Sequence, residues 1–238
     1  MSIQIKDTKK QGHETKWLSV SDLMSGLMMV FMLVSIMLIR DAIVFKQEYE
    51  SVNTRITEIA EDLRNEFSKD MEKWGADFIE ESLEFRFLTP EVNFQKGKSD
   101  LKPRFEDILS DFFPRYLEVL KPYRDDIKEV RLEGHTSSEW NADSTDKEAY
   151  FENMDLSQRR TRSVLHYVYG LPAVVQDDRQ REWVKANIVA VGLSSSKLIR
   201  HRNGNENKRL SRRVTFRVIT TAEEKFLCIK SEHCTNNE

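Results

Sequence analysis

The sequence predicts a single N-terminal transmembrane helix, a helical stalk and then a two-layer α/β domain with one sheet and helices on one side. Three observations support this fold class. An apolar stretch lies near the N-terminus, a charged segment with apolar residues at helical spacing follows it, and later strand-like and helical stretches alternate. We expect five segments, namely a cytoplasmic N-terminus (1–17), the transmembrane helix (18–39), a helical connector (40–83), the folded domain (84–220) and a C-terminal tail (221–238).

The apolar stretch 18–39 carries one charged side chain, Asp22. Its length is close to the ~20 residues that a helix needs to cross a bilayer. A cleaved signal peptide would have a shorter apolar core followed by a small-residue cleavage site, whereas Arg40 and Asp41 follow this stretch directly. We therefore expect a retained single-pass anchor. Lysines before the stretch favour a cytoplasmic N-terminus.

Asp22 is the residue of this stretch that most clearly indicates function. A carboxylate inside the bilayer costs at least ~2.5–3.5 kcal/mol, and such residues usually face a partner helix or a water-filled path. Ser25 and Gly26 lie on its helical face, where small residues allow another helix to approach closely. The pattern predicts an ion path shared with a multi-span partner. The alternative is that Asp22 lies at headgroup level and only caps the helix.

The connector has an apolar seam at helical, nearly heptad spacing. A parallel dimer would bury this seam, and we favour that interpretation. The alternative is a single helix that lies on its own domain or on a partner. The seam comprises Val52, Ile56, Ile59, Leu63, Phe67, Met71, Trp74 and Phe78.

The remainder alternates between strand-like and helical patterns, which predicts one sheet with helices packed on one side. Residues 84–88, 127–132, 187–191 and 213–219 have the polar–apolar alternation of strands. Residues 105–120 and 156–169 have helical periodicity.

Three short motifs lie at the boundaries of these elements. Gly134-His135-Thr136 follows a predicted strand, Asn153 and the run 156–160 (LSQRR) open the second helix, and residues 212–214 (RRV) open the last strand. Together they resemble the peptidoglycan-binding domain of the outer-membrane-protein-A (OmpA) family over roughly residues 90–220. The run WLSVSDLMSGLMMVFMLVSI is similar to the transmembrane helix of flagellar stator B subunits, a resemblance that places Asp22 on that family's ion-binding aspartate.

The resemblance implies a peptidoglycan site. Peptide stems of the wall present carboxylates, which a guanidinium binds in a bidentate manner, so Arg160 is the expected anchor. By the resemblance, Asn153 and Leu156 line the same groove, Thr136 and Ser137 form its opposite lip, and Arg213 supports it. The alternative for Arg160 is an ordinary exposed helix charge, a role that suits Arg159 better.

The sequence departs from the OmpA-family pattern at two places. Ser137 stands where the pattern GHTD has an acid, so the carboxylate that would pair with the ligand's ammonium group is missing. The segment between Thr136 and Leu156 is also longer than the pattern by about eight residues, and Asp143 or Asp146 in it could supply the acid.

The two resemblances together imply a stator B subunit of the bacterial inner membrane. It would conduct H⁺ or Na⁺, with H⁺ favoured, need no cofactor, and act as a homodimer inside a ring of multi-span A-type subunits. The extended loop, the DLMSGLMM run and a tail with Cys228 and Cys234 resemble the B subunit of Zorya anti-phage defence systems. A flagellar stator B subunit and a non-conducting tether from membrane to wall remain alternatives. Whether the two cysteines form a disulfide is left open.

Other functional classes have no support in the sequence. The net charge of −3 gives no case for binding nucleic acid. Motifs for a nucleophile elbow, a P-loop, HExxH or CxxC are absent, and the five histidines show no metal-ligand spacing. We therefore expect neither an enzyme nor a metal protein.

Overall fold

The computed structural model describes residues 8–88, 93–95 and 97–221, and side chains from Ser21 onward except at positions 48, 49, 51 and 52. The chain divides into two compact units, residues 1–51 and 52–238. Each unit is described by itself. Cys228 and Cys234 lie outside the described residues.

The first unit is formed by the helix α1, which runs from Thr8 to Phe67 and continues into the second unit. Its stretch Ser21–Gln47 is long and apolar enough to cross a membrane, and an 18-residue window within it has a mean hydropathy of 2.3. The large apolar side chains from Leu23 to Phe45 are exposed, at 46–77%. The predicted N-terminal apolar helix is therefore confirmed. Apolar exposure on this scale requires a lipid or protein surface to cover it.

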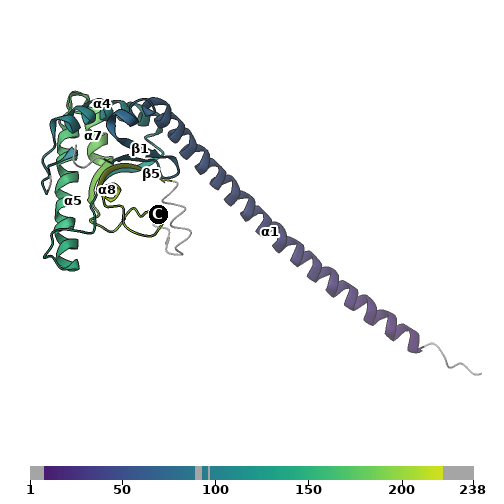
Figure 1. The fold of residues 1–238 in the computed structure, drawn as a ribbon. Coiled ribbons are helices and arrows are strands. Elements are labelled where there is room, and N and C mark those ends of the chain that lie inside the picture. Colours follow the sequence, from purple (N-terminus) through teal and green to yellow (C-terminus); the bar gives the residue numbers. More distant parts are fainter. Residues whose placement is uncertain (1–7, 89–92, 96, 222–238) are drawn as a thin grey trace, which may run out of the picture. The chain divides into compact units, whose positions relative to one another are not determined.

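The second unit contains one sheet, which within the described residues has five strands in the order β1-β2-β5-β3-β4. β3 and β4 are parallel and the other neighbouring strands are antiparallel. The predicted two-layer α/β domain is confirmed, with α4, α5 and α7 beside the sheet (Figure 1). The strands are β1 (Ala76–Ile79), β2 (Glu84–Phe87), β3 (Ile127–His135), β4 (Ile188–Gly192) and β5 (Arg213–Thr220).

The main helices of this domain begin at clear start signals. α4 (Pro103–Leu120) has a proline at its first position, where the missing N–H costs nothing. α5 (Asp146–Tyr169) begins with a capping box between Thr145 and Glu148. α7 (Asp178–Asn187) is capped by Asp177. Shorter helices are α2 (Met71–Trp74), α6 (Pro172–Val175), α8 (Lys208–Ser211) and the 3-10 turns η1 (Glu80–Ser82) and η2 (Lys121–Tyr123).

The predicted start of the second helix, at residue 156, is too late. α5 begins at Asp146, so the segment between Thr136 and Leu156 is helix rather than loop from residue 146 onward. The capping box explains the early start, because it satisfies orphan backbone donors at the new N-terminus.

An aromatic cluster between the sheet and α4 forms the centre of the core. Phe85 of β2 and Phe216 of β5 each lie 5.1 Å, centroid to centroid, from the ring of Phe112 on α4. All three side chains are completely buried. Aromatic pairs at such distances add about 0.5–1.5 kcal/mol each to the burial of their area.

The end of α1 belongs to this core, which corrects the expectation of a paired stalk. Ile59, Leu63 and Phe67 are completely buried within the same chain, and Trp74 of α2 is 3% exposed. The ring of Phe67 lies 5.1 Å from that of Phe112. These side chains already have partners, so a second chain cannot bury them as well.

Polar contacts hold the same helix end against the domain. Arg115 of α4 donates from Nε to Glu66 at 2.6 Å and from Nη1 to Asp70 at 3.0 Å. Tyr123 donates its hydroxyl hydrogen to Asp62 at 2.6 Å. The predicted domain start at residue 84 is therefore too late, since the compact unit begins at residue 52 and includes β1 within the predicted connector.

Candidate functional site

The candidate ion site on α1 consists of a carboxylate with small residues on its helical face. Asp22, Ser25 and Gly26 are exposed, and their i, i+3 and i+4 spacing places them on one face. The Ser25 hydroxyl donates to the backbone carbonyl of Ser21 at 2.8 Å. This contact satisfies the hydroxyl within the helix, which lowers the cost of placing it in lipid.

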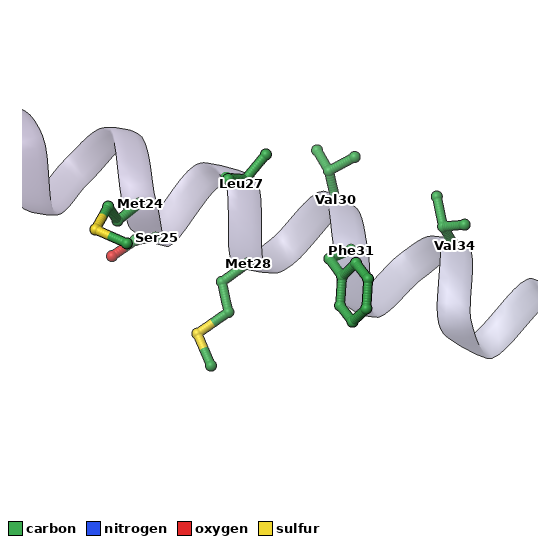
Figure 2. Close-up of a pocket in the computed structure, with 7 residues that line it drawn as sticks. All are labelled: Met24, Ser25, Leu27, Met28, Val30, Phe31 and Val34. Atoms are coloured by element: carbon green, nitrogen blue, oxygen red, sulfur yellow. The ribbon is translucent and has the colours of Figure 1, made fainter.

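Gly26 leaves an open place on the helix surface. Apart from the adjacent residues and backbone of α1 itself, a Cβ added there would meet none of the described residues within 4 Å, so packing among them does not require a glycine at this position. Figure 2 shows the neighbouring stretch, with Leu27, Val30 and Val34 projecting from one side of α1 and Met28 from the other. A small residue beside bulky apolar ones is typical of a contact between transmembrane helices.

In the domain, glycines allow α5 to lie close against the sheet. A Cβ at Gly134, at the end of β3, would come within 2.6 Å of the carbonyl oxygen of Ser157. A Cβ at Gly192, at the end of β4, would come within 2.6 Å of the backbone nitrogen of Gln158. The first position of the GHT motif is thus a packing requirement that brings the motif against α5.

Asn153 holds the loop after β3. Its Nδ2 donates to the carbonyl oxygens of Ser137 at 3.1 Å and of Glu139 at 3.0 Å. Thr136, whose backbone nitrogen donates to Ser194 at 2.9 Å, and Ser137 are 3–4% exposed. The structure therefore brings the predicted residues together, but these loop side chains are buried and the Asn153 donors are already used. Leu156, one turn along α5, is also buried.

Arg160 is not an ordinary surface charge. It is 8% exposed, its Nε donates to the carbonyl oxygen of Lys98 at 3.0 Å, and its guanidinium carbon lies 4.9 Å from the centre of the Phe94 ring. Arg159 is exposed and pairs with Asp155 at 2.8 Å, four residues earlier on the same helix. The sequence thus distinguished correctly between the two neighbouring arginines.

Arg213 meets Arg160 at a small pocket. Arg160, Arg213, Asn93, Phe94 and Val214 line this pocket, which has room for about one water-sized group. Arg213 is 6% exposed and its Nη1 donates to the carbonyl oxygen of Lys197 at 3.2 Å. Two positively charged guanidinium groups that line the same pocket favour the binding of an anion. The two oxygens of a carboxylate match the geometry of the guanidinium N–H donors.

The sequence prediction missed Asn93 and Phe94. Phe94 forms an isolated bridge with Leu101 and packs on Phe105 of α4, with 5.7 Å between ring centres. No strand-like or helical pattern marks this short segment. A polar residue directly before a phenylalanine was the available signal, but by itself it does not indicate a site.

Behind the pocket, the sheet face away from α4 carries buried charges. Glu84, Glu133 and His135 each place a ligand atom within 4.8 Å of the others. Burial lowers the pKa of Arg213 to about 10, while Glu84 and Glu133 act in the opposite direction. Glu84 also contacts Arg86 at 2.8 Å. Because arginines already compensate both carboxylates, this cluster is a buried ion-pair network rather than a cation site.

His135 belongs to the same network. Its Nε2 lies 3.3 Å from Glu133 Oε2. Burial lowers the pKa of His135, partly offset by Glu133 and reinforced by Arg213. Burial would raise the pKa of Glu133, but the contact with His135 and the nearby arginines leave this pKa below its ordinary value. The imidazole is therefore neutral at neutral pH.

The missing acid of the GHTD pattern is not supplied at the pocket by the two aspartates proposed from the sequence. Asp146 is the first residue of α5 and lies 14 residues before Arg160, or ~21 Å along the helix at 1.5 Å per residue. Asp143 is exposed in the preceding loop. The acid that contacts the residue after Ser137 is Glu206, which accepts from the backbone nitrogen of Ser138 at 3.0 Å. Sequence reasoning missed Glu206.

The fold and the arginine-lined pocket define a membrane-attached domain of the OmpA type, and the OmpA family model matches residues 93–212. The chain is 45% identical to Zorya protein ZorB from Escherichia coli (strain Crooks) over 220 residues, which cover 90% of this chain and 92% of that protein. A MotB-like protein from Desulfovibrio vulgaris has the same domain fold, with a TM-score of 0.50, 22% identity, and coverage of 71% of this chain and 93% of that one.

The chain therefore belongs to the OmpA family and to the family of Zorya protein ZorB. This membership places the chain among structural or stator subunits rather than enzymes. The apolar helix and the periplasmic-type domain fit a single-pass protein of the inner membrane.

Proposed function

We propose that this protein is the ion-conducting, wall-anchored stator subunit of an ion-driven motor in the bacterial inner membrane, with its N-terminus cytoplasmic and its domain periplasmic. The observation that carries this proposal is Asp22, an acid with Ser25 and Gly26 on its face at the start of an apolar, exposed helix. A tether needs only the apolar surface. Placing an acid in such a helix within the membrane costs free energy, so its presence indicates a functional role.

The chemistry of Asp22 fits ion transfer. In a site of low dielectric constant the charged carboxylate is disfavoured unless a proton or cation neutralises it. Neutral Asp22 can move past apolar surface, while charged Asp22 requires donors or water. Alternate binding and release of H⁺, which we favour over Na⁺, would couple ion flow to movement of a multi-span A-type partner that surrounds this helix.

The partner arrangement is a ring of A-type subunits around two copies of this chain. Because Ile59, Leu63 and Phe67 lie in the core of their own domain, we assign contact between the two copies to the part of α1 before Ile59. Exposed Ile43, Val44 and Phe45 supply apolar surface there.

The domain would hold the motor to the wall. Peptide stems of peptidoglycan carry carboxylates, and the pocket of Arg160 and Arg213 offers two guanidinium groups for one of them. The 45% identity to Zorya protein ZorB favours anti-phage defence over flagellar motility. Helicase or nuclease genes beside the coding gene would agree with defence, and flagellar or chemotaxis genes with motility.

Asp22→Asn tests the motor. The substitution keeps the shape and imitates the neutral state permanently, so assembly with the A-type partner should persist while phage protection is lost. Asp41→Asn is the matched control, because Asp41 lies two residues beyond the transmembrane segment 18–39 predicted from the sequence and should already be in reach of water. Protection is measured as plating efficiency of phage in strains with equal amounts of each variant. Full protection with Asp22→Asn would reduce the protein to a tether.

A further inference from the structure

Asn93 is a buried amide without a hydrogen-bond partner for its side chain. It is 1% exposed, and neither its Oδ1 nor its Nδ2 has a partner among the described residues. Its backbone is fixed, since its carbonyl oxygen accepts from the backbone nitrogen of Lys102 at 3.0 Å. A buried polar group left unpaired costs about 1–3 kcal/mol, so an apolar side chain would suit this position better if packing were its sole role.

The position of Asn93 points to a ligand. The side chain lines the pocket formed with Arg160 and Arg213, and Arg213 Nε is likewise buried and has no hydrogen-bond partner in the part of the chain that the structure describes. The pocket thus joins an unpartnered amide to two guanidinium groups in a space that holds about one water-sized group. One oxygen atom of a ligand fits the size of this pocket. As a hydrogen-bond acceptor it also matches the N–H donors that line the pocket.

We propose that Asn93 is a third ligand-binding residue of the pocket and donates from Nδ2 to one oxygen of a terminal carboxylate whose charge Arg160 and Arg213 neutralise. This inference rests on the proposed wall-binding function. The small pocket admits one oxygen, so the carboxylate enters end-on from a free chain terminus. The ligand class is therefore a peptide stem with a free carboxylate, and stems whose terminal carboxyl is amidated or crosslinked bind more weakly.

Two substitutions at Asn93 separate recognition from packing. Asn93→Leu keeps the number and branching of the side-chain heavy atoms and removes the unpaired amide, so the domain should remain folded with a melting temperature close to that of wild type. Binding to sacculi should weaken by about tenfold or more, the loss expected for a hydrogen bond to a charged group. Asn93→Asp keeps the shape but places a competing carboxylate beside both arginines, and it should also abolish binding in a folded protein.

The measurement is co-sedimentation of the full-length protein in detergent with purified peptidoglycan sacculi, combined with thermal unfolding followed by circular dichroism. Asn205→Leu, an exposed asparagine of the same domain, is the control and should bind like wild type. Sacculi amidated at their stem carboxylates test the proposed ligand. Weaker binding to amidated sacculi by wild type, with a smaller decrease for Asn93→Leu, supports the assignment.

The outcomes are distinct. Wild type that fails to sediment, or an Arg160→Ala variant that sediments like wild type, overturns the wall-binding function itself. If Arg160→Ala loses binding and Asn93→Leu does not, only the role of Asn93 is overturned. The small pocket beside Asn93 would then hold a water molecule instead of a ligand oxygen. If Asn93→Leu lowers both the melting temperature and binding, Asn93→Asp decides, and retained binding by a folded Asn93→Asp refutes the inference.

Discussion

Phe67→Ala tests whether the end of α1 is part of the domain core. In the structure the Phe67 ring is completely buried and contacts Phe85 at 5.2 Å and Phe112 at 5.1 Å between ring centres. The guanidinium carbon of Arg115 lies 4.9 Å from the centre of the same ring. A paired stalk would instead place this ring between two chains.

The expected loss follows from these contacts. Removal of a completely buried phenylalanine ring costs about 3–5 kcal/mol through lost transfer free energy and the cavity left behind. A domain of this size is stable by about 5–15 kcal/mol. The substitution should therefore remove a large fraction of the free energy of unfolding. Glu61→Ala, at an exposed position of the same helix, should change it by less than about 0.5 kcal/mol.

The assay is urea unfolding of the soluble fragment 52–221, followed by tryptophan fluorescence. Trp74 lies 5.9 Å from Phe67 between ring centres and reports on the region directly. The unfolding midpoint should not depend on protein concentration, as it would for a core shared by two chains. A fragment that begins at residue 84 should fail to fold, because it lacks β1 and these helical residues. A loss below 1 kcal/mol, together with a concentration-dependent midpoint, would restore the paired-stalk interpretation.

Two further predictions concern the domain. Arg160→Ala should weaken co-sedimentation with sacculi by about tenfold or more, since a charge-assisted contact is lost, whereas Arg159→Ala on the exposed side of α5 should bind like wild type. Because the pKa of His135 is lowered on folding, the unfolded state binds the extra proton more readily. Stability should thus fall as pH drops below the ordinary histidine value of ~6.5, by at most about 1.4 kcal/mol per pH unit. Urea midpoints at pH 7.5 and 5.5 measure this fall in stability. His135→Gln should reduce the fall. The stability that is still lost at lower pH is then due to Glu133, whose pKa is also lowered in the folded state.

Much of the domain fold could be predicted from local patterns. The strands β2, β3, β4 and β5 all overlap alternating segments of the sequence, because alternate residues face the core. The short strand β1 was missed, since its four residues lie in a segment whose apolar spacing also fits a helix. Spacing alone could not determine which partner the connector covers. An apolar seam looks the same whether a second chain or the same chain buries it.

The candidate site was predictable where a motif carried it. The motifs located Arg160, Arg213 and Asn153, but they could not show that the donors of Asn153 are used by the loop. Asn93 and Glu206 were missed for a different reason. Glu206 contacts Ser138, and Asn93 lines a pocket with Arg160 and Arg213. These neighbours are far away in the sequence, and no periodic pattern encodes such an arrangement.

The buried network behind the pocket also explains how two guanidinium groups can line it. Burial alone disfavours the charged form of Arg213, and its pKa is lowered to about 10. Glu84 and Glu133 oppose this effect from the sheet face, so Arg213 stays charged at neutral pH without an ionised acid in the pocket itself. In the proposed function, the charge of Arg213 that would attract an anion is therefore supported by carboxylates that do not line the pocket. Loss of Glu133 would leave the buried Arg213 with less compensation for its charge, which would lower the stability of the folded domain.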